Sequence, residues 1–160
     1  MAAEGSVTPP GPVAAAWVDL PNVRFPGGRI YSGGRPRPQH LRQAQCGGVR
    51  AVIDLCAPSE PRDYDERRLA ESLGMEYLNI PITGPADLNR ANARQLAQAL
   101  HRTAGGAALV HCANGNRAGA LLALKAHFID RCSVETSLAT GRAAGLQTLE
   151  AEVRCILAGL

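Results

Sequence analysis

The sequence has no apolar run that approaches the roughly 20 residues of a membrane-spanning helix. Its first 16 residues have neither the basic start nor the long apolar middle of a secretory leader. We therefore expect a soluble protein with no membrane partner and a cytoplasmic location. A periplasmic location stays open, because the Ala-, Gly- and Pro-rich residues 1–16 fit the remnant of a longer leader.

Runs of Lys and Arg are also missing, although 17 basic residues against 14 acidic ones give a net charge of +3. A mild excess spread along the chain does not follow a nucleic-acid backbone, so we expect no nucleic-acid partner. Arginine greatly outnumbers lysine, which fits oxyanion recognition. The composition carries no signal for a cofactor or for an oligomeric state.

The cysteines follow neither a zinc-ribbon pattern nor that of a small disulfide scaffold. There are 5, an odd number, at positions 46, 56, 112, 132 and 155. We expect a reduced protein without a bound metal, in which each cysteine has to be judged by its own surroundings.

The chain has the size of one domain: it has 160 residues, of which 46% are hydrophobic. Residues 1–16 have no periodicity and are predicted to be a flexible segment, and residues 17–160 are predicted to form the domain. Apolar and turn patterns predict strands over 29–32, 49–55, 76–82 and 107–111, and helices over 38–44, 63–73, 89–103, 117–129, from Ser133 to the break at Gly145, and over 149–157.

This alternation of strands and helices predicts an α/β fold, with a mainly parallel sheet flanked by helices on both faces. In such sheets, ligands bind beyond the carboxyl ends of the strands. The strand over 107–111 delivers Cys112 to that edge, ahead of a loop that ends at Arg117.

The physics of this loop favours a site for an anion. Gly115 permits backbone conformations that other residues resist, and the N–H groups and dipole of the following helix favour negative charge. The same field favours a negative charge at Cys112, and Arg117 can hold two oxygens of a substrate. Substrate oxygens are expected to meet the loop residues around the cysteine, which are Ala113, Asn114, Gly115, Asn116 and Ala118. The alternative is a buried structural cysteine beside an ordinary turn.

His111 and Cys112, with Gly115 and Arg117, resemble the signature of the cysteine-dependent protein tyrosine and dual-specificity phosphatases. More closely, residues 17–157 resemble the bacterial phosphatase-like domain family that is also found fused to the beta-lactamase-hydrolase-like protein. The stretches that carry this resemblance are 30–36, 49–55, 77–81, 111–119 and 141–146. It implies a dual-specificity-phosphatase-like fold and a phosphatase that needs no metal or cofactor and cleaves phosphomonoesters through a phosphocysteine.

The loop departs from that pattern in two places. Cys112 and Arg117 enclose four residues where the phosphatases have five, and Ala118 replaces the Ser or Thr that often follows the arginine. The shorter loop resembles that of the rhodanese-type sulfurtransferases, so a sulfur-donor substrate and a Cys112 persulfide are the alternative to a phosphate ester. A non-catalytic module that binds an oxyanion or a partner is the third hypothesis.

The resemblance assigns further roles. It implies that Asp87 is the general acid, for which the alternative is a helix N-cap, and that His111 orders the loop. Residues 53–57 resemble a stretch of some lipid phosphatases, which implies a reversible disulfide between Cys56 and Cys112; the alternative is a cysteine that lines the core. Asp54, inside a buried strand, is expected to bond to loop N–H groups or Arg side chains.

Overall fold

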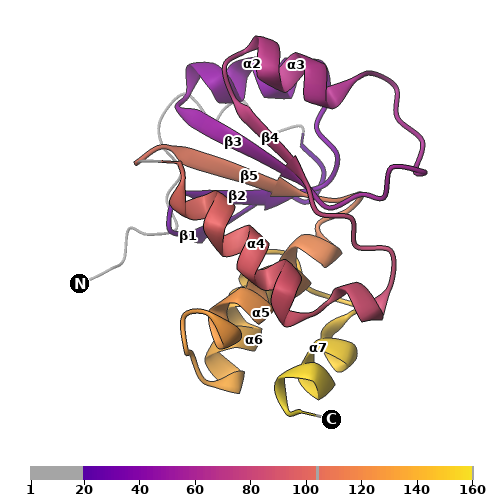
Figure 1. The fold of residues 1–160 in the computed structure, drawn as a ribbon, viewed down its shortest axis with the longest axis vertical. Helices are drawn as coiled ribbons and strands as arrows, with labels where there is room; N and C mark the ends of the chain where they lie inside the picture. Colours follow the sequence, from indigo (N-terminus) through magenta and orange to yellow (C-terminus); the bar gives the residue numbers. More distant parts are fainter. Residues whose placement is uncertain (1–19, 104, 160) are drawn as a thin grey trace.

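The computed structural model describes residues 20–103 and 105–159, so the predicted flexible segment, 1–16, lies outside the described residues. Five strands form one sheet in the order β1-β2-β5-β3-β4 (Figure 1). Their bounds are Arg24–Gly27 (β1), Ile30–Gly33 (β2), Val49–Asp54 (β3), Glu76–Asn79 (β4) and Ala107–His111 (β5). β2, β5, β3 and β4 are parallel, and only β1 is antiparallel to its neighbour. The prediction of a mainly parallel α/β sheet is confirmed.

Helices cover both faces of this sheet (Figure 1). The first face carries α2 (Pro38–Cys46) and α3 (Glu66–Ser72), and the second carries α4 (Arg90–His101), α5 (Asn116–Phe128), α6 (Val134–Ala143) and α7 (Glu150–Leu157). β5 is buried throughout, and its side chains alternate between the two cores: Leu109 packs on the first face, and Ala108 and Val110 pack on the second.

Two sequence-based boundaries differ from the structure by three residues. The helix predicted over 63–73 begins only at Glu66, because Asp65 caps it by accepting a hydrogen bond from the Arg68 N–H at 3.0 Å. The strand predicted over 76–82 ends at Asn79. The Ile80 and Ile82 N–H groups still donate to the carbonyls at the end of β3 and just after it, but Pro81 between them has no N–H to continue the ladder.

The α5–α6 packing relies on glycine at position 119. A Cβ atom there would lie 2.3 Å from the backbone nitrogen of Leu146 and 2.6 Å from the carbonyl oxygen of Gly141. Only a residue without a side chain allows this approach, which brings the chain after α6 against the start of α5.

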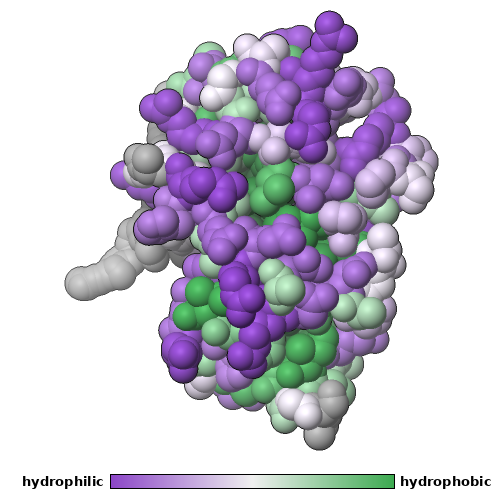
Figure 2. Space-filling view, viewed as in Figure 1, coloured by the Kyte–Doolittle hydropathy of each residue, from purple (hydrophilic) through white to green (hydrophobic). Residues whose placement is uncertain are grey.

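The face drawn in Figure 2 is mostly hydrophilic, and its hydrophobic patches lie mainly over the half of the molecule formed by the C-terminal helices. Within residues 20–103 and 105–159, the helices are too short or too polar to cross a membrane.

Candidate active site

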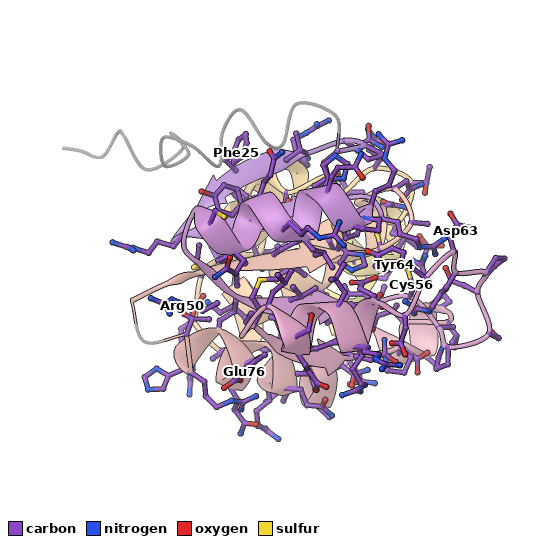
Figure 3. The ribbon with its side chains drawn as sticks, turned by 90° about the horizontal axis from the view of Figure 1, so that it is seen from above. Phe25, Arg50, Cys56, Asp63, Tyr64 and Glu76 are labelled. Atoms are coloured by element: carbon purple, nitrogen blue, oxygen red, sulfur yellow. The ribbon has the colours of Figure 1, made fainter. Side chains whose placement is uncertain are left out.

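Cys112 lies at the carboxyl edge of the sheet, directly after β5. Figure 3 shows this direction: Arg50 and Glu76, near the starts of β3 and β4, lie toward one side, and Cys56 and Tyr64, beyond β3, lie toward the other. The Cys112 N–H donates to the carbonyl of Gly33 at 3.2 Å, and the residue is fully buried. The thiol therefore has a fixed place at the base of the loop.

The Cys112 thiol lies against Gly115, the residue that precedes α5. Gly115 adopts φ +93°, and its N–H donates to Cys112 Sγ at 3.0 Å. The Asn116 N–H is taken by Asn114 Oδ1 at 3.0 Å, while Arg117 and Ala118 follow in the first turn of α5, where N–H groups have no intrahelical acceptor. Cys112 therefore lies beside the N-terminus of α5, an environment that favours negative charge.

Segments from both halves of the chain support the loop. Gly34 forms a bridge with Asn114, and a Cβ atom at Gly34 would lie 2.8 Å from the carbonyl oxygen of Ala113. On the other side, a Cβ atom at Gly145 would lie 2.8 Å from the carbonyl oxygen of Gly115. These contacts give a structural reason for two of the stretches that carry the family resemblance, 30–36 and 141–146: each holds a glycine that packs against the cysteine loop.

Asn116 fastens the start of α5 to the segment ahead of α7. Its Oδ1 accepts from the N–H of Gln147 at 2.8 Å, and its Nδ2 donates to Thr148 Oγ1 at 2.6 Å. The side chain of this predicted substrate-binding residue thus has a structural role, and the residue also lines the cavity beside the loop.

Arg117 is held by a carboxylate that the sequence did not single out. Its Nη1 and Nη2 donate to Glu60 at 2.7 Å and 3.1 Å, and Nη1 also donates to the carbonyl of Ile82 at 3.0 Å. The hydrogen bonds from Arg117, the largest cause, lower the pKa of Glu60 to about 2 despite partial burial. The same pairing raises the pKa of Arg117 above its usual range, so both groups are charged at neutral pH.

Asp87 lies in the 3-10 turn η3 (Pro85–Asp87), and its carboxylate closes that turn. Oδ2 accepts from the backbone N–H of Thr83 at 2.8 Å and from its hydroxyl at 2.6 Å. These bonds from Thr83 hold the pKa of Asp87 below its ordinary value. The alternative role as N-cap of α4 is wrong, because Asn89 fills that position by accepting from the Asn92 N–H at 2.8 Å.

His111 is fully buried, and its side chain contacts α3. Nε2 lies 2.5 Å from Glu66 Oε2 and 3.8 Å from Asp54 Oδ1. Burial by itself would lower the pKa of His111, but Glu66, the Cys56 thiol and Asp54 outweigh it and raise the pKa to about 10. The imidazole is therefore a buried cation at neutral pH, one residue before the predicted nucleophile.

Asp54 makes the contacts expected of it. Oδ1 accepts from the Cys56 N–H at 2.9 Å, and Oδ2 accepts from Arg62 at 2.6 Å. Burial would raise the pKa of Asp54, but His111, Tyr77 and these bonds hold it below the ordinary value. The carboxylate is thus ionised and ties the loop after β3 to the sheet edge.

Cys56 and Cys112 follow neighbouring parallel strands and are offset by one residue. Asp54 pairs with His111, and both cysteines are buried, unpaired and part of the same core. Arg35 Nη2 donates to Cys56 Sγ at 3.2 Å. The predicted redox partner therefore lies at the same edge as the predicted nucleophile.

Asp54, Cys56 and His111 offer ligand atoms within 4.8 Å of one another, which is a spacing suited to a metal ion. In the structure, however, the His111 nitrogen that faces this cluster, Nε2, is paired with Glu66 at 2.5 Å. The cluster is better described as a buried ion-pair network than as a metal centre.

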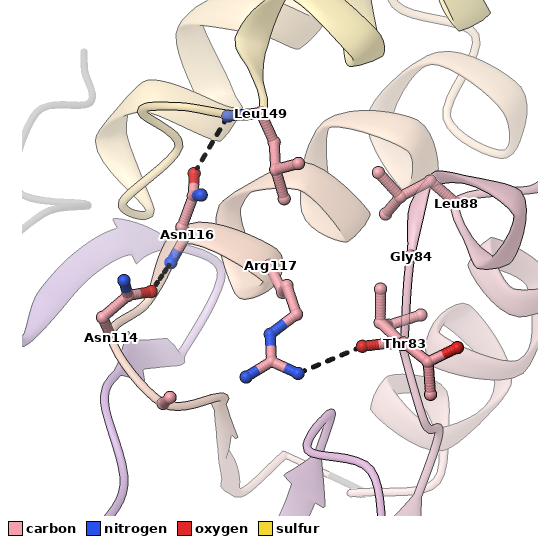
Figure 4. Close-up of a pocket in the computed structure, with 9 residues that line it drawn as sticks. Thr83, Gly84, Leu88, Asn114, Asn116, Arg117 and Leu149 are labelled. Atoms are coloured by element: carbon pink, nitrogen blue, oxygen red, sulfur yellow. Dashed lines mark hydrogen bonds between the residues drawn. The ribbon is translucent and has the colours of Figure 1, made fainter.

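A cavity of about 310 Å³ opens beside the cysteine loop (Figure 4). Figure 4 shows the Arg117 guanidinium in its wall, with Leu88 and Leu149 above it and Thr83 beside it. Its lining includes four predicted residues, namely Ala113, Asn114, Asn116 and Arg117, together with Ile82, Thr83, Gly84, Leu88 and Leu149. Cys112 and Ala118 are fully buried behind this lining.

Three residues in contact with the site were missed by the sequence analysis: Arg35, Glu60 and Glu66. Arg35 lies in one of the stretches that resemble the phosphatase-like family, which is the signal that would have marked it. Glu60 and Glu66 belong to a segment dense in charges, 60–68, where nothing distinguishes a carboxylate that turns inward from one that faces solvent.

No protein-family model matches the chain, and a comparison with curated proteins gives no significant match. Solved structures do match. A DUF442 protein from Shewanella putrefaciens CN-32 has 20% identity and a TM-score of 0.68 over 91% of this chain and 96% of its own. Tk-PTP in its active form has 22% identity and a TM-score of 0.69 over 87% of this chain and 97% of its own.

A third structure is the kinase associated phosphatase with its catalytic-site cysteine replaced by serine, at 18% identity and a TM-score of 0.60 over 82% of this chain and 88% of its own. The fold of this chain is therefore the one shared by the cysteine-dependent tyrosine and dual-specificity phosphatases. This confirms the fold that the sequence resemblance implied.

Proposed function

We propose that the protein is a cysteine-dependent phosphatase that hydrolyses phosphomonoesters through a phosphocysteine at Cys112. One observation carries the proposal: the thiol accepts an N–H from Gly115 at the start of α5, on the same loop as a charged Arg117 that lines a cavity. Donors placed where charge develops are the main source of rate enhancement in phosphoryl transfer.

In the proposed reaction, the Cys112 thiolate attacks phosphorus and the bond from phosphorus to the ester oxygen breaks. The alcohol leaves with a proton supplied by an acid, and a water molecule then attacks the phosphocysteine. That second step releases inorganic phosphate and restores the thiolate. Arg117 and the N–H groups of the first turn of α5 neutralise the phosphoryl oxygens in both steps.

Asp87 is our candidate for the acid and then the base. In the structure its carboxylate is ionised and bonded to Thr83, which is the form that accepts a proton from water in the second step. To act as acid, it has to take up a proton as a dianionic substrate enters, so the Thr83–Asp87 contact would open during turnover.

The four-residue spacing from Cys112 to Arg117 favours one second candidate, a sulfurtransferase. In that reaction Cys112 takes the outer sulfur of thiosulfate, releasing sulfite, and passes it to a thiol acceptor. This chemistry needs no acid at position 87, so that residue separates the two candidates.

The test is a quenched intact-mass measurement after the protein meets equal amounts of an activated aryl phosphate and thiosulfate. A phosphoryl group mapped to Cys112 supports the phosphatase, and one added sulfur there supports the sulfurtransferase. With neither adduct but tight phosphate binding, the protein is a non-catalytic oxyanion-binding module. Cys112→Ser, which removes the nucleophile, is the matched control.

A further inference from the structure

A second hollow, of about 480 Å³, lies between η3 and α7. Glu152 is the one charged side chain among the described residues that line it, which are Pro85, Ala86, Ala151, Glu152, Cys155 and Ile156. Figure 2 shows hydrophobic surface over the part of the molecule where Figure 1 places α7. Exposed apolar hollows of this kind mark binding sites, and this one is called the apolar groove below.

The apolar groove continues the active-site cavity along one face of α7. Leu149, Glu152 and Ile156 are spaced by three and four residues, so they lie on the same side of the helix. Leu149 lines the cavity, and the other two line the groove. One side of α7 is therefore a wall of both hollows.

The segment around η3 forms the opposite wall of both hollows. Leu88 lines the cavity, whereas Pro85 and Ala86, just before it, line the groove. Figure 4 shows Leu88 across from Leu149, above the Arg117 guanidinium. A ligand whose oxyanion meets Arg117 therefore has apolar walls on the way from the cavity to the groove.

The η3 wall has little to offer a polar occupant. Pro85 has no N–H, and its carbonyl already accepts from the Leu88 N–H at 3.0 Å. The Ala86 carbonyl accepts from Asn89 Nδ2 at 3.0 Å. A peptide laid along this wall would lose water from its N–H groups without gaining a free carbonyl, which costs free energy. An alkyl chain has no such groups, and each methylene that leaves water favours binding.

We propose that the apolar groove binds the alkyl chain of an amphiphilic phosphomonoester whose phosphate lies at Arg117. The proposal rests on the proposed function for the place of the phosphate. It adds the substrate class, which is the monoester of a long-chain alcohol with an uncharged body. Glu152 repels any second negative charge on that body.

The experiment measures the dissociation constants of n-alkylphosphonates, from methyl to decyl, by calorimetry on the full chain below their micelle-forming concentrations. A phosphonate has no ester oxygen on the alkyl side that can leave, so binding is measured without turnover. We expect the constant to fall about two- to fourfold for each added methylene until the chain fills the groove, because complete burial of one methylene corresponds to about fourfold. A constant that ignores chain length, or no binding of any member, would overturn the proposal.

Ala151→Glu places a charge in the groove and is the test variant. Ala91→Glu is the matched control, because Ala91 is also exposed and is also the second residue of its helix. The gain per methylene should disappear in Ala151→Glu and persist in Ala91→Glu. This gain is the readout, since an added charge by itself weakens all members of the series alike. A gain that survives in Ala151→Glu contradicts the proposal. If this variant does not fold, Cys155→Asp, at another exposed position of the groove, replaces it with the same expectation and the same contradiction.

A peptide that carries a phosphonate between leucine residues tests the other occupant. If Ala151→Glu weakens the binding of this peptide more than that of octylphosphonate, the groove belongs to a peptide and the proposal is wrong. A smaller effect on the peptide supports the alkyl chain.

Because phosphonate binding is independent of turnover, the two proposals fail separately. A gain per methylene that Ala151→Glu removes, in a protein that forms no phosphocysteine, supports the groove and overturns the phosphatase. A phosphocysteine in a protein whose phosphonate binding ignores chain length does the reverse.

Discussion

At the scale of single residues, surroundings rather than residue type distinguish Cys112 from the other cysteines. Cys46 and Cys155 are exposed toward the C-terminal ends of α2 and α7, away from the start of either helix. Cys112 alone follows the central strand and faces the start of α5. The chemistry proposed for it therefore depends on position in the fold.

Replacing the nucleophile gives the first prediction. Cys112→Ser should abolish both phosphoester cleavage and sulfur transfer, since a serine hydroxyl is not ionised at neutral pH and α5 does not activate it sufficiently. Turnover of an aryl phosphate and of thiosulfate measures this, with circular dichroism as the check on folding. Unchanged turnover in a folded variant would rule out both enzymatic candidates.

Asp87 gives the second prediction. Asp87→Asn should slow phosphoester cleavage by about 10² to 10⁴, the usual contribution of a general acid or base, and should barely change sulfur transfer. Steady-state kinetics with an unactivated alkyl phosphate measures the effect, because a poor leaving group depends most on the acid. Thr83→Val, which removes only the hydroxyl that binds Asp87, is the control. It shows how much of any loss of rate comes from a disturbed turn and how much from the missing acid. Wild-type rates in Asp87→Asn would contradict the assignment.

At the scale of secondary structure, apolar runs and glycine breaks predicted, to within a few residues, the four parallel strands and the six α-helices that residues 20–103 and 105–159 contain. β1 was missed, because its sequence RFPG has no alternation and contains both proline and glycine, as edge strands permit. Cys112 and Arg117 were predicted as site residues because a strand, a loop and a helix in fixed order carry the signal. Glu60 and Glu66 were not, because their roles come from contacts between segments far apart in sequence.

The packing of α5 on α6 gives the third prediction. Gly119→Ala would place a methyl group 2.3 Å from the Leu146 nitrogen, so the helices have to separate. We expect a loss of about 1 to 3 kcal/mol in the free energy of unfolding, the usual cost of overpacking, measured by urea denaturation. Gly84→Ala is the matched control, since a Cβ atom there meets nothing within 4 Å and φ is −173°. Equal stability of the two variants would contradict this account.

The register of β3 and β5 bears on the proposed disulfide. We propose that mild peroxide links Cys56 to Cys112, because the two thiols follow paired strand ends. Peptide mapping should find the linked pair, and Cys56→Ser should instead accumulate sulfinic acid at Cys112. Sulfinic acid at Cys112 without the link in the unaltered protein would reject the idea.

At the scale of the whole molecule, the buried pair of His111 and Glu66 makes stability depend on pH. The pKa of His111 is about 10 when folded and about 6.5 when unfolded, so protonation favours the folded state. This contribution is complete below pH 6.5 and disappears as the pH rises toward 10. Asp54 acts in the opposite range, since its lowered pKa gives a contribution that disappears in acid.

The fourth prediction follows from that sign. The free energy of unfolding should fall between pH 7 and pH 10, and Glu66→Gln should flatten the decline, because the unpaired imidazole then loses its proton at lower pH. Urea denaturation across this range measures the slope, and Glu71→Gln supplies the comparison for the loss of a carboxylate on the same helix. Identical slopes in the two variants would contradict the assignment.

The supports of the cysteine loop also govern when the site is complete during synthesis. The loop is backed by Gly34, made early, and by Gly145 and Gln147, which leave the ribosome after nearly all of the domain. A nascent chain that already contains Cys112 and Arg117 therefore lacks one wall of its site. The nucleophile proposed at Cys112 would therefore gain its surroundings only when the segments on both sides of the loop are in place.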